Sequence, residues 1–204
     1  MIKWLFFDLG STLIDESACD MFRLRHMLSQ PGAPERHILE AKMREYSQNG
    51  LHPYKSALKD FNLEACPWPA ELEKPYPGVP ELLDALSRRY YLGVIANQIP
   101  GTENRLQKYG IRCYFNVIIA SAEAGIAKPD PEIFLMTLEK AGCRADEAMM
   151  IGDRIDNDIL PAARLGMHTI WVKQGMHRLA DTSKLEILPE YTVAGICELT
   201  DILL

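Results

Sequence analysis

The feature that most constrains this fold is a regular alternation of helical segments with short apolar runs after residue 78. The apolar runs are rich in Val, Ile and Leu, as in strands that are buried on both faces. A helix between consecutive strands makes a crossover connection, which sets the strands parallel. We therefore predict an α/β fold, a doubly wound (Rossmann-like) parallel sheet. The expected strands are 4–7, 91–97, 115–120, 148–151, 169–172 and 191–193, and the expected helices are 81–90, 102–109, 131–141, 158–165 and one closing segment.

Residues 15–75 have a different character, because they show helical spacing and no strand signal. Helices are expected at 16–29, from Pro34 or Glu35 to Asn49–Gly50, and at 53–61. The proline-dense segment 66–80 then returns the chain to the alternating pattern. The predicted organisation is a core domain of residues 1–14 and 76–204, with a small all-helical cap of residues 15–75 inserted after the first strand.

Composition excludes several classes of partner. The chain has 204 residues and a net charge of −6 with no basic stripe, which argues against a nucleic acid or an anionic membrane surface. No apolar run approaches the roughly 20 residues of a membrane span, and the N-terminus lacks a signal-peptide pattern, so a cytoplasmic location is expected. The five cysteines are scattered without a CxxC pair, which suggests neither disulfides nor a zinc site. The oligomeric state stays open.

A carboxylate ends the first apolar run. Asp8 follows the run directly, and the small residues Gly10, Ser11 and Thr12 come next. Such residues let backbone amides turn toward an anion, and ligands of open parallel sheets bind beyond the carboxyl ends of the strands. Asp8 is therefore a candidate catalytic residue, with Ser11 and Thr12 as candidate substrate contacts. The alternative is that Asp8 simply caps a helix.

Four further polar residues fall at or beside strand ends. Asn97 ends the second core strand, Lys128 precedes a helix N-terminus, Asp153 follows a strand, and Asp158 begins the next helix. Each has an ordinary alternative role, as a turn residue, a solvated lysine or a helix cap. Together, converging carboxylates need a cation, and hard oxygen ligands suit Mg²⁺. With Lys128 to hold a phosphoryl group, Asp8 could attack phosphorus and form an aspartyl phosphate that water hydrolyses.

The segments FFDLGSTLID, VIANQ, AKPDPEIF and IGDRIDNDI, in this order, resemble the four motifs of the haloacid dehalogenase-like (HAD) hydrolase superfamily. The helical insertion resembles the C1-type cap of that superfamily. The resemblance implies a Mg²⁺-dependent phosphatase of a small phosphorylated metabolite. It implies that Asp8 is the nucleophile, and that Asp8, the Gly10 carbonyl and Asp153 hold Mg²⁺. Lys128 would hold the phosphoryl oxygens, and Asp158 would be a second acidic partner.

Two positions depart from the superfamily pattern. Gly10 stands where phosphatases usually carry an acid–base Asp, and Ala96 stands where a Ser or Thr usually holds a phosphoryl oxygen, with Asn97 beside it as a candidate substrate contact. Unless Asp15 or a cap residue reaches in, turnover should then favour good leaving groups such as acyl phosphates.

Two alternatives remain. One is a catalytically weakened HAD-fold binding or regulatory protein. The other is a 2-haloacid dehalogenase. The resemblance to that class implies an Asp-x-Tyr sequence, with Tyr at the position of Gly10, and an aromatic cradle for the halide. If a cap closes over a substrate, Arg23, Arg25 and His26 on its first helix are candidate contacts, although a solvated helix face also explains them.

Overall fold

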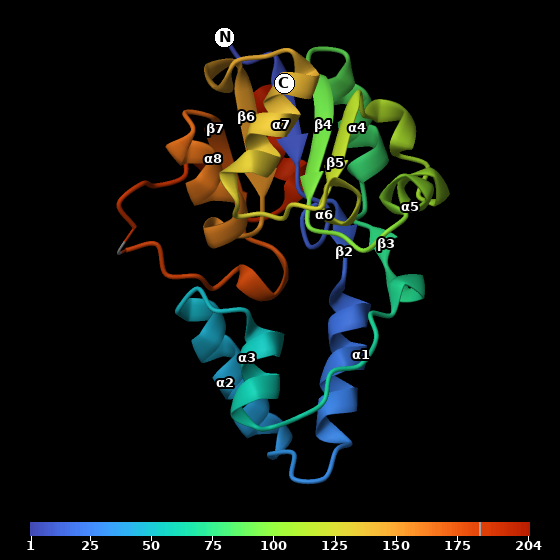
Figure 1. Cartoon of the computed structure of the whole chain (residues 1–204), viewed down its shortest axis with the longest axis vertical. Helices are drawn as coiled ribbons and strands as arrows, with labels where there is room; N and C mark the ends of the chain where they lie inside the picture. Colours follow the sequence, from blue (N-terminus) through green and yellow to red (C-terminus); the bar gives the residue numbers. More distant parts are fainter. Residues whose placement is uncertain (184) are drawn as a thin grey trace.

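The computed structural model describes residues 1–183 and 185–204, and its centre is a parallel sheet of six strands in the order β5-β4-β1-β6-β7-β8 (Figure 1). The first strand, β1, is therefore inner, between β4 and β6. This arrangement confirms the predicted α/β class. The strands of the sheet are β1 (Trp4–Phe7), β4 (Tyr91–Ala96), β5 (Val117–Ala120), β6 (Ala148–Gly152), β7 (His168–Val172) and β8 (Tyr191–Val193).

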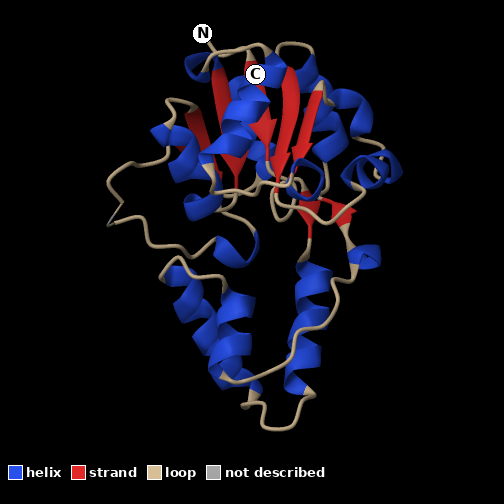
Figure 2. Cartoon of the chain, viewed as in Figure 1, coloured by secondary structure: helices blue, strands red, loops and turns tan. Residues whose placement is uncertain are grey.

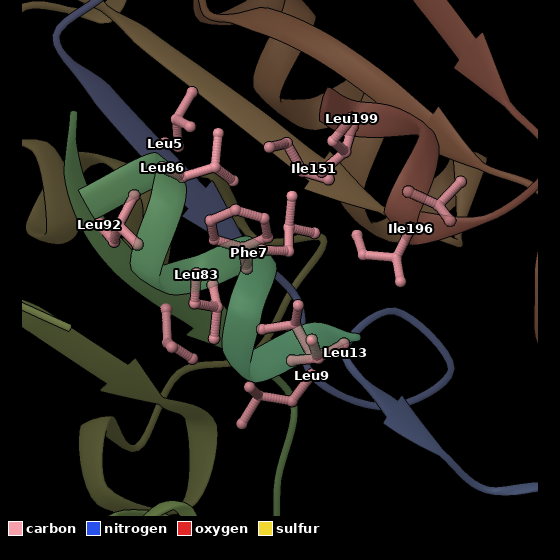
Figure 3. Packing of buried hydrophobic residues seen from close by; sticks show 14 of the residues in the cluster. Leu5, Phe7, Leu9, Leu13, Leu83, Leu86, Leu92, Ile151, Ile196 and Leu199 are labelled. Atoms are coloured by element: carbon pink, nitrogen blue, oxygen red, sulfur yellow. The ribbon is translucent and has the colours of Figure 1, made fainter. Parts of the chain in front are cut away.

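Helices cover both faces of the sheet. They are α4 (Val79–Ser87), α5 (Thr102–Lys108), α6 (Ser121–Ala124), α7 (Pro131–Ala141), α8 (Leu160–Arg164) and α9 (Leu199–Leu203). Side chains alternate along β1, so Leu5 and Phe7 pack with residues of α4 and α9 on one face, as Figure 3 shows. Phe6 faces the other way, onto a cluster that includes Phe134 of α7. Burial on both faces explains why the strands read as unbroken apolar runs.

Three helices form a second unit beyond the carboxyl ends of the strands (Figure 2). They are α1 (Ser17–Leu28), α2 (Arg36–Gln48) and α3 (Pro53–Asp60), and they share an apolar cluster of their own around Met27 and Leu39. The chain enters and leaves this unit through two short strands, β2 (Ile14–Asp15) and β3 (Lys74–Pro75), which pair antiparallel.

Several local expectations were wrong in detail. The proline-dense segment 66–80 contains β3, a strand of two residues that is too short to be predicted from periodicity. The helix expected at 158–165 is a π-helical turn, Ile155–Ile159, followed by α8. The strand expected at 115–120 begins only at Val117, because Arg112–Tyr114 forms a 3₁₀ turn that runs into Phe115.

Within the described part of the chain, no helix combines the length and the apolar character needed to cross a membrane.

Candidate active site

The site begins where two neighbouring strands end. Asp8 follows β1 and Asp153 follows β6, and the two strands pair with Phe7 opposite Ile151. The Asp8 amide extends this pairing by donating to the Ile151 carbonyl at 2.9 Å. Since the carboxyl ends of parallel strands share one edge of the sheet, the two carboxylates are brought together by the register alone.

Asp158 joins them from the π-helical turn. Its side chain lies directly over Gly152, so a Cβ atom at residue 152 would overlap the carboxylate. Its Oδ2 accepts a hydrogen bond from the Arg154 amide at 3.0 Å. The extra residue of a π turn and the glycine beneath it thus let an acidic side chain fold back toward the strand ends, where it is almost fully buried.

Lys128 lies between two of these carboxylates. Its Nζ is 2.6 Å from Asp8 Oδ1 and 2.6 Å from Asp158 Oδ1, and its side chain is only 2% exposed. Asn97 fixes the lysine backbone, because its amide Nδ2 donates to the Lys128 carbonyl and its Oδ1 accepts from the Lys128 N–H, both at 2.8 Å. Asn97 therefore orients Lys128, and its contact with a substrate stays a prediction.

The charges of the cluster are out of balance. Burial lowers the pKa of Lys128, but the carboxylates of Asp158 and Asp8 outweigh it, so the pKa is raised and the side chain is cationic. Burial raises the pKa of Asp158 to about 6 despite Lys128. Burial, together with the charges of Asp8 and Asp158, raises the pKa of Asp153 well above its ordinary value. A single ammonium group is too little positive charge for three buried carboxylates.

The imbalance fits a divalent cation. Asp8, Asp153 and Asp158 each offer an oxygen, and these oxygens lie within 4.8 Å of one another. Oxygen-only donors with two negative charges in excess are the set that Mg²⁺ prefers. Gly10, the other predicted metal ligand, lines the same pocket as these carboxylates.

The turn after β1 places the two predicted hydroxyl residues. Thr12 is buried and its Oγ1 lies 3.5 Å from Asp8 Oδ2. Ser11 has a left-handed backbone with φ of 56°, and its Oγ donates to Glu16 at 3.2 Å. Gln174 holds the turn from outside by donating to the Ser11 carbonyl at 3.3 Å. Both hydroxyls therefore contact acidic groups, and their contact with a substrate stays a prediction.

The carboxylate cluster opens into a pocket of about 520 Å³ between the sheet and α3. His52 and Lys55, at the start of α3, line it opposite the strand ends. The predicted cap contacts Arg23, Arg25 and His26 are not among the described residues that line it, and Arg23 instead stacks on Tyr54 at 3.3 Å from the ring centroid. The residues that line the pocket are Asp8, Gly10, Glu16, His52, Lys55, Asn97, Gln98, Ala127, Lys128, Asp153, Arg154, Asn157, Asp158 and His177.

Sequence reasoning missed five titratable residues of this lining: Glu16, His52, Lys55, Arg154 and His177. Two of them, His52 and His177, lie edge to face with ring centroids 5.5 Å apart. Burial, followed by the charges of neighbouring cationic groups, lowers the pKa of His52 to about 3 and that of His177 to about 4. Both rings are therefore neutral at pH 7. No local pattern marks His52 and Lys55, because only the packing of α3 against the core brings them to the pocket.

Comparison with known proteins gives one family. The family model described as haloacid dehalogenase-like hydrolase matches residues 5–172. A glyceraldehyde 3-phosphate phosphatase of Pyrococcus abyssi is 30% identical over 197 residues, covering 86% of this chain and 83% of the relative. A protein of the same name from Methanopyrus kandleri is 30% identical over 131 residues, covering 63% and 56%.

The chain spans 56%, 59% and 57% of the length of the first three curated relatives that it matches. Among solved structures, a predicted phosphoglycolate phosphatase from Haemophilus somnus superposes with a TM-score of 0.74 over 98% of this chain and 97% of that chain. Its sequence identity of 19% means that this likeness concerns the fold alone.

Proposed function

Because this chain belongs to the haloacid dehalogenase-like hydrolase family, we propose that it is a phosphatase of a small phosphorylated metabolite and acts through an aspartyl phosphate on Asp8. Relatives named as phosphatases support this reaction class. The observation that carries the proposal is the position of Lys128, whose ammonium group lies 2.6 Å from Asp8 and faces a pocket large enough for a small metabolite.

Each side chain of the cluster has a part in the proposed reaction. An oxygen of Asp8 attacks phosphorus, and the bond from phosphorus to the leaving oxygen breaks as the new bond to Asp8 forms. Lys128 stabilises the negative oxygens of the transferring group. Asp158 holds Lys128 in place at 2.6 Å and so acts as its positioning partner.

A metal ion completes the proposed site. Asp8, Asp153 and the Gly10 carbonyl would hold Mg²⁺, and the metal would neutralise charge so that a carboxylate and a phosphate can approach each other. The three buried carboxylates around a single lysine are what makes this fit.

The helical unit completes the pocket from the other side. We propose that residues 15–75 act as a C1-type cap that excludes water and contacts the leaving group. Support comes from His52 and Lys55, which line the pocket opposite Asp8. The unit is also tied to the core, because Ser47 Oγ donates to the Met176 carbonyl at 2.6 Å.

The test of the nucleophile is Asp8→Asn. The amide keeps the shape of the side chain but cannot attack phosphorus, so kcat on p-nitrophenyl phosphate should fall by at least about 10⁴-fold while thermal unfolding still shows a folded protein. Asp84→Asn, which changes an exposed carboxylate on α4, is the matched control and should keep full activity. BeF₃⁻ with Mg²⁺ should form its adduct on Asp8. Activity retained in Asp8→Asn, or an adduct elsewhere, would contradict the proposal.

One observation bears on the dehalogenase alternative. The described residues that line the pocket include no phenylalanine, tyrosine or tryptophan from which a halide cradle could be built. The wall is instead made of carboxylates, amides and cationic or imidazole side chains. Such a wall suits a charged phosphate ester better than a haloalkanoic acid.

A further inference from the structure

Glu16 lies against Gly10, the position at which the acid–base side chain of a phosphatase is expected. The turn after β1 reverses the chain, since the amides of Leu13 and Ile14 both donate to the Leu9 carbonyl at 2.9 Å. Glu16 follows two residues later, immediately before α1. A Cβ atom built on Gly10 would lie 2.5 Å from Glu16 Oε1 and 2.9 Å from its Cδ. The carboxyl group of Glu16 therefore fills the space that a side chain at residue 10 would enter.

The Glu16 carboxyl group is also turned toward the reaction. It lines the same pocket as Asp8 and Lys128. Its hydrogen bond comes from Ser11 Oγ at 3.2 Å, and among the described residues it makes no ion pair. A carboxyl group that no cation holds, placed beside a nucleophile and open to a substrate pocket, can exchange a proton with a bound ester.

The other acidic groups near this end of the chain are engaged elsewhere. Asp15 accepts a hydrogen bond from the Ser17 amide at 2.9 Å and lies 3.7 Å from Lys74 Nζ. Asp20 lies 3.8 Å from Arg23. Neither is among the described residues that line the pocket. Of these three carboxyl groups, Glu16 is thus the one that lines the pocket and makes no ion pair with a described residue.

We propose that Glu16 is the proton-transfer residue of this site, in place of a side chain at residue 10. The proposal rests on the proposed phosphatase function. In the first half-reaction, Asp8 bonds to phosphorus, the electron pair of the broken bond stays on the leaving oxygen, and the Glu16 carboxyl gives that oxygen its proton. In the second, a water oxygen bonds to phosphorus, Glu16 takes a proton from the water, and the Asp8 carboxylate leaves.

The sequence predicts a preference for good leaving groups unless Asp15 or a cap residue reaches the site, and under this proposal Glu16 is such a cap residue. Without an acid, alkyl phosphates should be far poorer substrates than p-nitrophenyl phosphate, because an alkoxide leaves only with a proton. With Glu16 in position, the dependence of kcat/KM on leaving-group pKa should be shallow in the natural protein. A steep dependence in the natural protein would overturn the proposal.

The first variant to test is Glu16→Gln. It should lower kcat/KM for an alkyl phosphate by about 10²- to 10⁴-fold and change that for p-nitrophenyl phosphate far less. Asp20→Asn, four residues further along, is the matched control and should leave both values unchanged. Glu16→Asp, which keeps the carboxyl group, should retain more alkyl phosphatase activity than Glu16→Gln. An equal loss on both substrates in Glu16→Gln would show a structural role and overturn the proposal.

The second test moves the carboxyl group to residue 10. The Gly10 backbone is outside the left-handed region, so it accepts a side chain once Glu16 is removed. Gly10→Asp/Glu16→Ala should hydrolyse an alkyl phosphate at least about tenfold faster than Glu16→Ala, whereas in Gly10→Asp alone the new side chain should displace the Glu16 carboxyl. A double variant no faster than Glu16→Ala would contradict a shared place for the two groups.

The two proposals fail in different ways. Activity retained by Asp8→Asn would count against the nucleophile and hence against the proposed function. A loss in Glu16→Gln that does not depend on the leaving group, with Asp8→Asn inactive, would count against Glu16 alone.

Discussion

At the scale of single residues, Lys128 provides the positive charge that partly compensates the buried carboxylates of the site. It is the cation between Asp8 and Asp158, and removing one member of a buried ion pair leaves the partners uncompensated. Lys128→Ala should therefore lower the free energy of unfolding in EDTA by about 3–5 kcal/mol, as measured by urea unfolding. It should also lower kcat/KM by about 10²-fold or more.

A surface lysine is the control for this variant. Lys140 of α7 is exposed, and Lys140→Ala should change the free energy of unfolding by no more than about 0.5 kcal/mol. If Lys128→Ala matched Lys140→Ala in both stability and kcat/KM, the central place given to Lys128 would be wrong.

The sequence identified those residues whose position follows from a strand end. Asp8 directly follows one predicted strand and Asp153 comes two residues after another, so the register of a parallel sheet brings them together. Asn97 was also found in this way, but not its hydrogen bonds to Lys128, because the two are 31 residues apart and meet only through the fold. Glu16 was missed because its place depends on a tight turn whose left-handed residue is a serine rather than a glycine.

At the scale of elements, the contact of α3 with the turn Gly175–His177 should make stability depend on pH. The pKa of His52 is lowered to about 3 and that of His177 to about 4, first by burial. Below pH 6.5 the unfolded chain therefore binds protons that the folded chain refuses, so this contribution to stability is complete above about pH 7 and is lost as pH falls.

The pH-dependent loss of unfolding free energy can be measured as the difference between the natural protein and a histidine variant. Between pH 7.5 and 5.5, one such histidine costs about 1.4 kcal/mol of unfolding free energy, so His177→Gln should lose about that much less stability than the natural protein over this interval. His37→Gln removes an exposed histidine of α2 and should follow the natural protein. Parallel pH profiles for His177→Gln and the natural protein would contradict the burial of the pair.

Element boundaries could be predicted where a pattern runs for several residues. The predicted range for α7 agrees with the structure at both ends, because Asp130 caps it, Pro131 opens it and Gly142 closes it. The π-helical turn could not be predicted, since its acidic residues read as an ordinary helix start. It forms because Asp158 is buried against Lys128 and Gly152, a tertiary cause that local spacing does not contain.

At the scale of the whole molecule, Mg²⁺ should stabilise the folded state. The three carboxylates converge only in the folded chain, and a ligand that binds only this state raises stability by mass action, by about 2.7 kcal/mol at a hundredfold excess over its Kd. A thermal shift in MgCl₂ compared with EDTA measures this effect. Asp153→Asn should abolish the shift.

A neighbouring carboxylate is the control for the metal. Asp156 is bound by Arg154 and is not part of the carboxylate cluster, so Asp156→Asn should keep the Mg²⁺ shift. If the natural protein showed no shift, or if Asp153→Asn kept it, the assignment of the metal site would be wrong.

The sheet was predictable at this scale, whereas the pocket was not. Alternating helices and strands leave few topologies open. The pocket wall depends on the position of α3 relative to the core. Tertiary contacts set this position, such as the packing of Met176 against the apolar cluster of the helical unit. The charged face of α1 predicted that this helix would line the pocket. Arg23 instead stacks on the rings of Tyr54 and Trp68, and the start of α3 provides the lining residues.

The pairing of β2 with β3 has a consequence for how such chains can change. Since Asp15 and Lys74 lie opposite each other, the chain departs from the sheet domain and returns to it at one spot. An insertion between these two residues therefore need not change the register of the sheet. Glu16 lies just beyond this junction, so an exchange of the helical module would carry its carboxyl group away or bring a different one in. Under both proposals, such an exchange would change the contacts with the leaving group and the proton-transfer residue in a single step.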